Sequence, residues 1–224
     1  MRLSIVVPTL NERACLPATL AALQPLRRRG HEVILVDGGS DDGTPALAAG
    51  RVDRLLTAPT GRASQLATGI AAARHEVLWL LHADSGLPPA ADRAILRAVA
   101  TGRPWGRFDV RLSGRHPLLR VVARLMNWRS CLTGICTGDQ GIFVTHAALQ
   151  AVGGLPRQPL MEDVELSRRL RRRHGRPACL RPPLVTSSRR WERHGILRTI
   201  LLMWALRAAY ALGVPPERLA RCYA

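Results

Sequence analysis

Short apolar runs alternate with longer amphipathic segments through the first half of the chain. Four runs have the length and flanking turn residues that are typical of strands, at residues 3–7, 33–36, 54–57 and 77–81. Four segments have apolar residues at helical spacing, at residues 14–29, 44–49, 64–74 and 90–100. Strands that alternate with helices in this way predict βαβ units and a parallel sheet.

The second half of the chain is less regular. Strands are predicted at residues 108–112 and 141–144, and helices at residues 116–128, 162–173 and 196–212. The last of these helices is strongly apolar and is interrupted only by Arg198 and Arg207. Because no repeat or low-complexity linker divides the chain, we expect one α/β domain over residues 1–190 and a helical extension over residues 191–224.

The run at residues 77–81 leads directly into candidate chemistry. Its five apolar residues fit a strand that is buried on both faces, and His82 and Asp84 follow it before the turn at residues 86–89. Open α/β sheets bind ligands outside the carboxyl ends of their strands. Residues two apart in an extended chain point to one side, about 6.5–7 Å apart. We therefore expect His82 and Asp84 to converge on a divalent cation and, through it, on a phosphate.

Polar segments also follow the first two predicted strands. Thr9 and Glu12 lie in Pro-Thr-Leu-Asn-Glu at residues 8–12, and Asp37 begins Asp-Gly-Gly-Ser-Asp-Asp-Gly-Thr at residues 37–44. Glycines let a backbone approach a ligand closely, and Asp37 can accept a hydrogen bond from a base or a ribose hydroxyl. Taken singly, the first segment could be only a helix cap, and the second only a tight acidic turn.

The order and spacing of these motifs, together with Met-Glu-Asp at residues 161–163, resemble the family 2 glycosyltransferases of the GT-A fold over roughly residues 1–190. The chain looks most like a small bacterial group with Leu-His-Ala-Asp, Gly-Asp-Gln-Gly and Met-Glu-Asp-Val-Glu-Leu signatures, here at residues 81–84, 138–141 and 161–166. This resemblance implies a Rossmann-like, mostly parallel sheet flanked by helices, with a C-terminal apolar helix. It also implies a nucleotide-binding half over residues 1–100 and an acceptor and catalytic half over residues 101–190.

The resemblance assigns donor-binding roles. Thr9, Glu12 and Asp37 match positions that line the nucleotide pocket, with Asp37 facing the base. Arg62 matches a basic residue that approaches the nucleotide. Asp84 matches the last aspartate of the family's Asp-x-Asp motif, which holds Mn²⁺ or Mg²⁺ on the donor diphosphate.

His82 departs from that pattern, because it stands where the family has the first aspartate of the motif. It is either a substitute contact to the ribose or the metal, or the mark of a subgroup with its own substrate.

Asp163 is the candidate catalytic base, with Glu162 as the second choice. On a helix Asp163 shares a face with Leu166 and Leu170, so it points toward the protein if those leucines pack inward. Glu165 is expected to form an ordinary surface pair with Arg169. The alternative is that Asp163 only complements the positive end of the helix dipole.

Two further motifs supply candidate contacts. The resemblance places Asp139 and Gln140 beside the sugars, although turn chemistry would explain them equally well. Residues 187–194 look like a shortened Gln-x-x-Arg-Trp motif, in which Arg190 could neutralise the departing diphosphate and Trp191 could stack on a sugar. His194 is either a further metal ligand or an ordinary surface histidine.

Composition also bears on the binding partner and the cellular compartment of the protein. The chain has 33 basic residues, all arginine, against 16 acidic ones, for a net charge of +17. A GC-rich genome favours arginine, but the excess also suits a nucleoside diphosphate, an anionic membrane surface or nucleic acid. The five cysteines form no Cys-x-x-Cys pair, so we expect reduced thiols and no zinc site. The first apolar run is too short for a signal peptide, which indicates the cytoplasm, with the inner face of the membrane as an option.

The membrane question concerns the apolar helices at residues 116–128 and 196–212. The second has 17 residues with two internal arginines, which is marginal for a spanning helix. Together with Trp128, Trp191 and Trp204, these helices could instead lie at the interface and reach a lipid-borne acceptor. The alternative is a helix packed on the sheet.

The sequence thus predicts an inverting, metal-dependent glycosyltransferase that moves a sugar from a nucleoside-diphosphate sugar to a hydroxyl of a small-molecule or lipid-like acceptor. A nucleotidyltransferase should have a basic, glycine-rich signature after the first strand, and residues 8–12 have none. A nucleic-acid- or membrane-binding protein on a degenerate domain of this fold is the other alternative. No recognisable nucleic-acid-binding motif is present, and aromatic residues make up 4% of the chain, so we expect no specific nucleic-acid partner.

Overall fold

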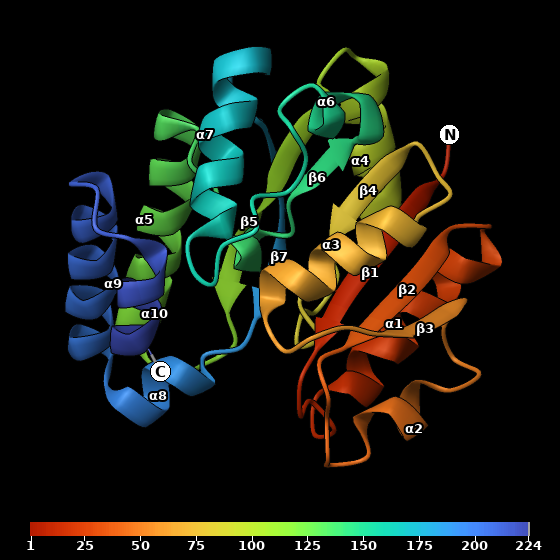
Figure 1. The fold of residues 1–224 in the computed structure, drawn as a ribbon, viewed down its shortest axis with the longest axis horizontal. Coiled ribbons are helices and arrows are strands. Elements are labelled where there is room, and N and C mark those ends of the chain that lie inside the picture. Colours follow the sequence, from red (N-terminus) through yellow and green to blue (C-terminus); the bar gives the residue numbers. More distant parts are fainter. Residues whose placement is uncertain (224) are drawn as a thin grey trace.

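A seven-stranded, mostly parallel sheet forms the centre of the protein in a computed structural model, which describes residues 1–223 (Figure 1). The strand order is β3-β2-β1-β4-β6-β5-β7. Only β6 is antiparallel to its neighbours, β4 and β5. The strands are β1 (Leu3–Thr9), β2 (Glu32–Asp37), β3 (Arg54–Thr57), β4 (Val77–Leu80), β5 (Trp105–Leu112), β6 (Phe143–Thr145) and β7 (Ala178–Thr186).

Helices cover both faces of this sheet and extend beyond one edge (Figure 1). They are α1 (Leu16–Arg28), α2 (Thr44–Ala48), α3 (Arg62–Ala72), α4 (Ala91–Ala100), α5 (Pro117–Thr133), the 3₁₀ turn η1 (Gly138–Gln140), α6 (His146–Gln150), α7 (Glu162–His174), α8 (Arg189–His194), α9 (Ile196–Ala211) and α10 (Pro216–Tyr223).

The alternation of side chains along the strands builds two separate cores. Ile5 and Trp79 face the layer formed by α1 and α4. Val6 and Leu78 face the opposite layer, which includes α3 and α7. All four residues of β4 are buried, which confirms the strand predicted to be covered on both faces. The predicted α/β fold class is also confirmed.

The C-terminal helices pack beside α5 at one end of the molecule, where Figure 1 shows α9 and α10 in blue. Leu119 and Val122 of α5 contact Ile196 and Ile200 of α9 in a small apolar cluster. A second cluster joins α7 to α9 and α10. Within residues 1–223 no helix is both long enough and apolar enough to cross a bilayer. The division into units at residue 190 stays a prediction, and α8 lies across it.

Strand β7 is the main element that the sequence pattern does not predict. Pro182 and Pro183 lie within it, and proline cannot donate to a strand ladder. The strand tolerates them because it lies at the edge and pairs in the sheet only with β5. The register between the two strands also shifts between Phe108 and Val110, so that extra residues of β7 bulge out. The short helix α6 is likewise not predicted, and the sequence indicates no separate bounds for α8 and α10, which lie mostly within the helical extension predicted at residues 191–224.

A disulfide joins Cys131 of α5 to Cys179 of β7, with the two Cα atoms 6.0 Å apart. The expectation that all cysteines are reduced thiols is therefore wrong for this pair. The two residues are separated by 48 positions, and only the packing of α5 beside β5 and β7 brings them together. Cys15, Cys136 and Cys222 are free.

Candidate active site

The polar segments predicted from the sequence meet at the carboxyl edge of the parallel strands. Thr9 ends β1 and pairs in register with Asp37, which ends β2. Strand β4 runs parallel to β1 and leads to His82 and Asp84 just beyond its last residue. This common edge places side chains from three loops around one region of the molecule.

Asp37 organises the loop that follows β2. It is buried, and its carboxylate accepts hydrogen bonds from the backbone N–H groups of Gly39 (2.9 Å) and Ser40 (2.8 Å) and from the hydroxyl of Thr9 (3.3 Å). Burial alone would raise the pKa of this carboxyl, but these bonds and one from the Ser40 hydroxyl hold the pKa below its ordinary value. Asp37 is therefore ionised and shapes the loop, and its expected contact with a nucleotide base stays a prediction.

Gln65 is a structural residue of this edge that sequence reasoning missed. Its side-chain N–H group donates to the backbone carbonyls of Thr9 (2.6 Å) and Val36 (3.0 Å), which lie at the ends of β1 and β2. The amide lies so close to Gly38 that a Cβ there would meet it at 3.0 Å. A side chain in place of Gly38 would therefore crowd the Gln65 amide, which the two backbone carbonyls hold in place. Nothing in the local sequence distinguishes Gln65 from an exposed helix residue.

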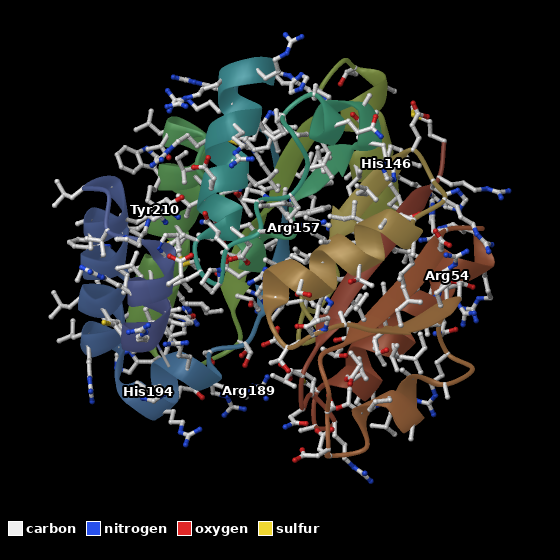
Figure 2. All side chains as sticks on the ribbon, viewed as in Figure 1. Arg54, His146, Arg157, Arg189, His194 and Tyr210 are labelled. Atoms are coloured by element: carbon white, nitrogen blue, oxygen red, sulfur yellow. A yellow bond between two sulfur atoms is a disulfide. The ribbon has the colours of Figure 1, made fainter. Side chains whose placement is uncertain are left out.

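Glu12, Asp84 and Arg189 form the first charged group of the site. The guanidinium of Arg189, which Figure 2 labels beside α8, donates to Glu12 Oε2 at 3.1 Å and lies 3.5 Å from Asp84 Oδ2. The Cys15 thiol donates to the same oxygen of Glu12 at 2.7 Å. Asp84, Cys15 and Arg189 line a cavity of about 310 Å³. Three segments far apart in the sequence therefore meet here: the loop after β1, the loop after β4 and the start of α8.

Negative charge is in excess in this group. Burial raises the pKa of Asp84, the charge of Glu12 raises it further, and Arg189 opposes both. Burial and the contact with Glu12 also raise the pKa of Cys15 to about 12, so the thiol stays protonated at neutral pH. The hydrogen bond with Glu12 raises the pKa of Arg189. The place between the two carboxylates therefore favours a positive charge.

These two carboxylates fit a divalent metal that is shared with a substrate. Oxygen ligands suit Mg²⁺ and Mn²⁺, and enzymes commonly hold Mg²⁺ with one or two carboxylates together with substrate phosphates. The Arg189 guanidinium lies where such a cation would contact Glu12 and Asp84. No group of three or more His, Cys, Asp and Glu side chains within residues 1–223 could hold a metal alone. His194 belongs to no such group and is exposed on α8, so its predicted role as a metal ligand gains no support.

A second group surrounds the start of α7. Arg62 Nε lies 3.3 Å from Glu162 Oε1, and the backbone N–H of Gly138 donates to Asp163 Oδ2 at 2.7 Å. The residue before this helix, Met161, has a φ of 65°. A residue with a side chain adopts this left-handed conformation at a cost of order 1–3 kcal/mol. The strain fixes the turn that delivers Glu162 and Asp163 to the site.

Carboxyl groups crowd together in this second group. Burial raises the pKa of Glu162. The charge of Arg62 lowers this pKa, whereas the charge of Asp163 raises it. Burial also raises the pKa of Asp139. A hydrogen bond from Thr137 lowers this pKa, and the charge of Asp163 raises it further. Leu166 and Leu170 are buried, so the helix face that they share with Asp163 is directed toward the protein. Groups with raised pKa values beside a cation are characteristic of sites that move protons.

His82 and Arg62 link the two groups. His82 Nδ1 lies 4.0 Å from Asp84 Oδ1, and burial followed by the charge of Arg62 lowers the pKa of His82 well below its ordinary value. The ring is therefore neutral at pH 7. Its Nε2 atom is buried and has no hydrogen-bond partner within the described part of the chain. A buried nitrogen without a partner is costly, which marks this atom as a candidate for a hydrogen bond with a bound water or ligand.

Two predicted contacts, Arg190 and Trp191, have partners away from the charged groups. Arg190 donates to the backbone carbonyl of Tyr223 at 3.0 Å and stacks 3.7 Å over the ring of that tyrosine, so it anchors α10. Trp191 packs against the apolar cluster between α5 and α9. Arg189, the neighbour of Arg190, is the arginine that reaches Asp84. Successive residues of a helix point in different directions, and the sequence offered no signal for choosing between the two arginines.

Gln140 has structural partners at the start of η1 and in α5, and its expected contact with a sugar stays a prediction. Its side chain is fully buried, accepts from the backbone N–H of Thr137 (3.1 Å) and donates to the hydroxyl of Ser130 (2.9 Å). It closes a capping box on η1, which is the turn chemistry weighed in the sequence analysis. Asp139, in contrast, stays a candidate contact beside Asp163.

The charge balance around Asp84 predicts opposite shifts in its titration. Replacing Glu12→Gln removes a neighbouring negative charge and is expected to lower the pKa of Asp84, whereas Arg189→Gln removes a positive charge and is expected to raise it. Arg190→Gln is the matched control and should leave the titration unchanged. Carboxyl ¹³C NMR shifts followed across a pH series would measure all three. An unchanged Asp84 titration in both site variants would contradict the arrangement.

Comparison with known proteins is consistent with this geometry. Residues 4–144 match the family described as glycosyl transferase family 2. The beta-monoglucosyldiacylglycerol synthase of Synechocystis sp. is 26% identical over 232 residues. The match covers 93% of this chain and 47% of that relative, so the chain spans about half the relative's length.

Solved structures share the fold at low sequence identity. S. aureus TarS 1–349 has a TM-score of 0.65 at 16% identity, covering 84% of this chain and 61% of that chain. The mannosyltransferase PcManGT from Pyrobaculum calidifontis, in complex with GDP-Man and Mn²⁺, has a TM-score of 0.61 at 23% identity, covering 83% and 56%. Glucosyl-3-phosphoglycerate synthase from Mycobacterium tuberculosis, with Mn²⁺, UDP and glucosyl-3-phosphoglycerate, has a TM-score of 0.63 at 21% identity, covering 83% and 70%. Because the family match extends over more than half of its length, the chain belongs to glycosyl transferase family 2.

Proposed function

We propose that the protein is an inverting, metal-dependent glycosyltransferase that moves a sugar from a nucleoside-diphosphate sugar to an acceptor hydroxyl. The observation that carries the proposal is the meeting of two charged groups, Glu12 with Asp84 and Glu162 with Asp163, at the carboxyl edge of the parallel sheet. Structural neighbours in complex with UDP-GlcNAc, with GDP-Man and Mn²⁺, and with UDP and Mn²⁺ support the class of donor and the metal. Family membership favours sugar transfer over nucleotidyl transfer or a purely binding role.

The Asp84 group binds the donor diphosphate in this proposal. A Mn²⁺ or Mg²⁺ ion held by Asp84, with Glu12 beside it, would neutralise charge that develops on the leaving diphosphate. Arg189 then moves from between the carboxylates toward the phosphate oxygens, which it can contact with two parallel N–H donors. The partnerless Nε2 of His82 contacts the ribose or the sugar between the two groups.

Asp163 accepts the proton of the acceptor hydroxyl as it attacks. Glu162 is less suited to that task, because it is buried and paired with Arg62. Asp163 is partly exposed, and the backbone N–H of Gly138 orients one oxygen of its carboxylate. Attack by an acceptor on the face of the sugar opposite the diphosphate inverts the anomeric configuration. Glu162 therefore acts by positioning Arg62.

Separate variants distinguish donor binding from proton transfer. Asp163→Asn is expected to reduce transfer by about 10²–10⁴-fold while nucleotide binding is retained, because only the base is lost. Asp84→Asn is expected to abolish the part of the thermal stabilisation by UDP, GDP or dTDP that depends on Mn²⁺. Glu76→Gln, an exposed carboxylate at the opposite end of β4, is the matched control.

The measurements are thermal shifts with each nucleotide sugar, with and without Mn²⁺, and release of the nucleoside diphosphate. If no nucleotide stabilised the wild-type protein, or if Asp163→Asn retained full transfer, the proposal would fail.

We further propose a lipid-like acceptor that is reached by peripheral contact with an anionic membrane. The relative named beta-monoglucosyldiacylglycerol synthase supports an acceptor of this kind. Two neighbouring helices each expose a stripe of large apolar residues, namely Leu118, Val121, Leu125, Trp128 and Leu132 of α5, and Leu197, Leu201 and Trp204 of α9. Arg120 and Arg124 are exposed on α5 among them. Apolar residues beside arginines suit a helix that lies in the headgroup region of anionic lipids.

The double variant Trp128→Ser/Trp204→Ser is expected to lose most sedimentation with vesicles containing phosphatidylglycerol, because it removes the two largest exposed apolar side chains. Leu55→Ser, an exposed leucine on β3 at the far edge of the sheet, should sediment like the wild type. Binding should weaken at high salt, because the arginines contribute electrostatically. No sedimentation of the wild type at low salt would refute membrane contact.

A further inference from the structure

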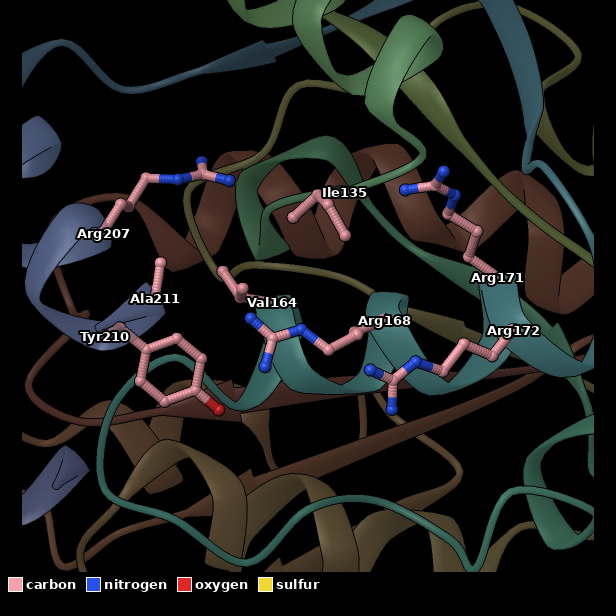
Figure 3. Close-up of a pocket in the computed structure, with 8 residues that line it drawn as sticks. All are labelled: Ile135, Val164, Arg168, Arg171, Arg172, Arg207, Tyr210 and Ala211. Atoms are coloured by element: carbon pink, nitrogen blue, oxygen red, sulfur yellow. The ribbon is translucent and has the colours of Figure 1, made fainter. Parts of the chain in front are cut away.

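A large cavity lies between α7 and α9, away from the Asp84 group (Figure 3). Its volume is about 710 Å³, more than twice that of the cavity at Asp84. Ile135, Val164 and Ala211 give it apolar walls. It has room for an organic ligand rather than a single ion.

Four arginines surround this cavity. Arg168, Arg171 and Arg172 share one face of α7, because they are three and four positions apart, and Arg207 faces them from α9. Figure 3 shows their guanidinium groups directed toward the space between the two helices. We call the cavity that these four residues line the arginine cavity.

The positive charge of the arginine cavity is poorly balanced within the protein. Arg168 lies 3.5 Å from Glu165 Oε2, but Glu165 also accepts a hydrogen bond from Arg169 at 2.9 Å. Within residues 1–223 the structure records no hydrogen bond or ion pair for the side chains of Arg171, Arg172 or Arg207. Four guanidinium groups that line one cavity repel one another, so the arrangement favours binding of an anion.

Arg207 shows most clearly that the site is built rather than incidental. Partial burial lowers its pKa, and Arg129, another half-buried guanidinium, has a pKa lowered to about 10 by burial and then by the charge of Arg207. Two cations thus share a partly desolvated region, at a cost in free energy that an anionic ligand would offset.

The chemistry of the walls identifies the class of anion. Guanidinium forks match the oxygens of phosphate with paired N–H donors, and several of them together match a dianion better than a single carboxylate. The Tyr210 hydroxyl lies at the rim and already contacts Gln158 (3.3 Å) and Glu165 (3.4 Å). The apolar walls can receive the organic part of a phosphate ester.

The cavity adjoins the second charged group of the active site. Val164, which lines it, directly follows Asp163, and the charges of Asp163 and Asp139 act on Arg207. The cavity therefore lies on the side of the candidate base, where an acceptor enters. We propose that the arginine cavity binds a phosphate group carried by the acceptor, from either a soluble phosphate ester or a phospholipid headgroup. The assignment to the acceptor rests on the proposed function, but the phosphate site itself does not.

Direct binding tests the site without catalysis. Calorimetric titration with inorganic phosphate and with sn-glycerol 3-phosphate, each against sodium chloride of matched ionic strength, is expected to show saturable binding. Arg172→Gln/Arg207→Gln should weaken it by about tenfold or more, because two charge-assisted contacts are lost. Arg173→Gln/Arg176→Gln removes the same charge at two exposed positions outside the cavity and should change the affinity less than about twofold. Circular dichroism melting of all variants establishes that they fold.

A second arm distinguishes the source of the phosphate. Nanodiscs of phosphatidylcholine with and without phosphatidic acid present the same group on a lipid, and the cavity variant should lose binding to phosphatidic acid if a headgroup is the source. If the cavity variant loses affinity for glycerol phosphate only, the site takes a soluble phosphate ester. If it loses affinity for both probes, the site also takes a phospholipid headgroup. The inference is overturned if the wild type binds neither probe above the chloride control, or if the two double variants lose affinity equally.

Failure of this inference is separable from failure of the proposed function. UDP with Mn²⁺ should stabilise the Arg172→Gln/Arg207→Gln variant as it does the wild type, because the donor lies at Asp84. If the variant also raises the acceptor KM while kcat is preserved, the phosphate belongs to the acceptor. If kcat falls and KM is unchanged, the acceptor assignment is wrong.

Discussion

Buried and half-buried carboxylates outnumber the cations beside them at the carboxyl edge of the sheet, and the fold compensates by bringing arginines to them from distant segments. Arg189 lies between Glu12 and Asp84, and Arg62 pairs with Glu162. Each pair joins parts of the chain that only tertiary structure brings together. Glu162 is buried, and a buried charge without its partner is costly, so the turn before α7 depends on the contact with Arg62. The same excess of negative charge makes the edge suitable for a metal and an anionic substrate together.

The fold of the N-terminal half, residues 1–100, was largely predictable because its information is local. Apolar runs such as 77–81 carry enough hydrophobic pattern to identify strands, and in a parallel sheet the residue after a strand must lie at the ligand-binding edge. Asp84 and the Asp163 helix were placed correctly for this reason. The strained φ of Met161 was invisible, because methionine carries no signal for a left-handed turn.

The second half was harder because its decisive contacts are between segments. Two prolines conceal β7, which exists because β5 offers an edge and the bulge accommodates the extra residues. The choice between Arg189 and Arg190 depends on the direction in which α8 enters, and the Cys131–Cys179 disulfide depends on how α5 packs. Composition revealed a surplus of arginine but not its location. In the structure part of that surplus gathers between α7 and α9, beside the candidate base.

Crystals grown with UDP and Mn²⁺ would test the central claim most directly, by the anomalous scattering of manganese. We expect one strong Mn²⁺ peak within coordination distance of Asp84 and the diphosphate, with Arg189 moved from between Glu12 and Asp84 to the phosphate oxygens. Manganese and nucleotide bound elsewhere, with the contacts of Arg189 to Glu12 and Asp84 intact, would contradict the account.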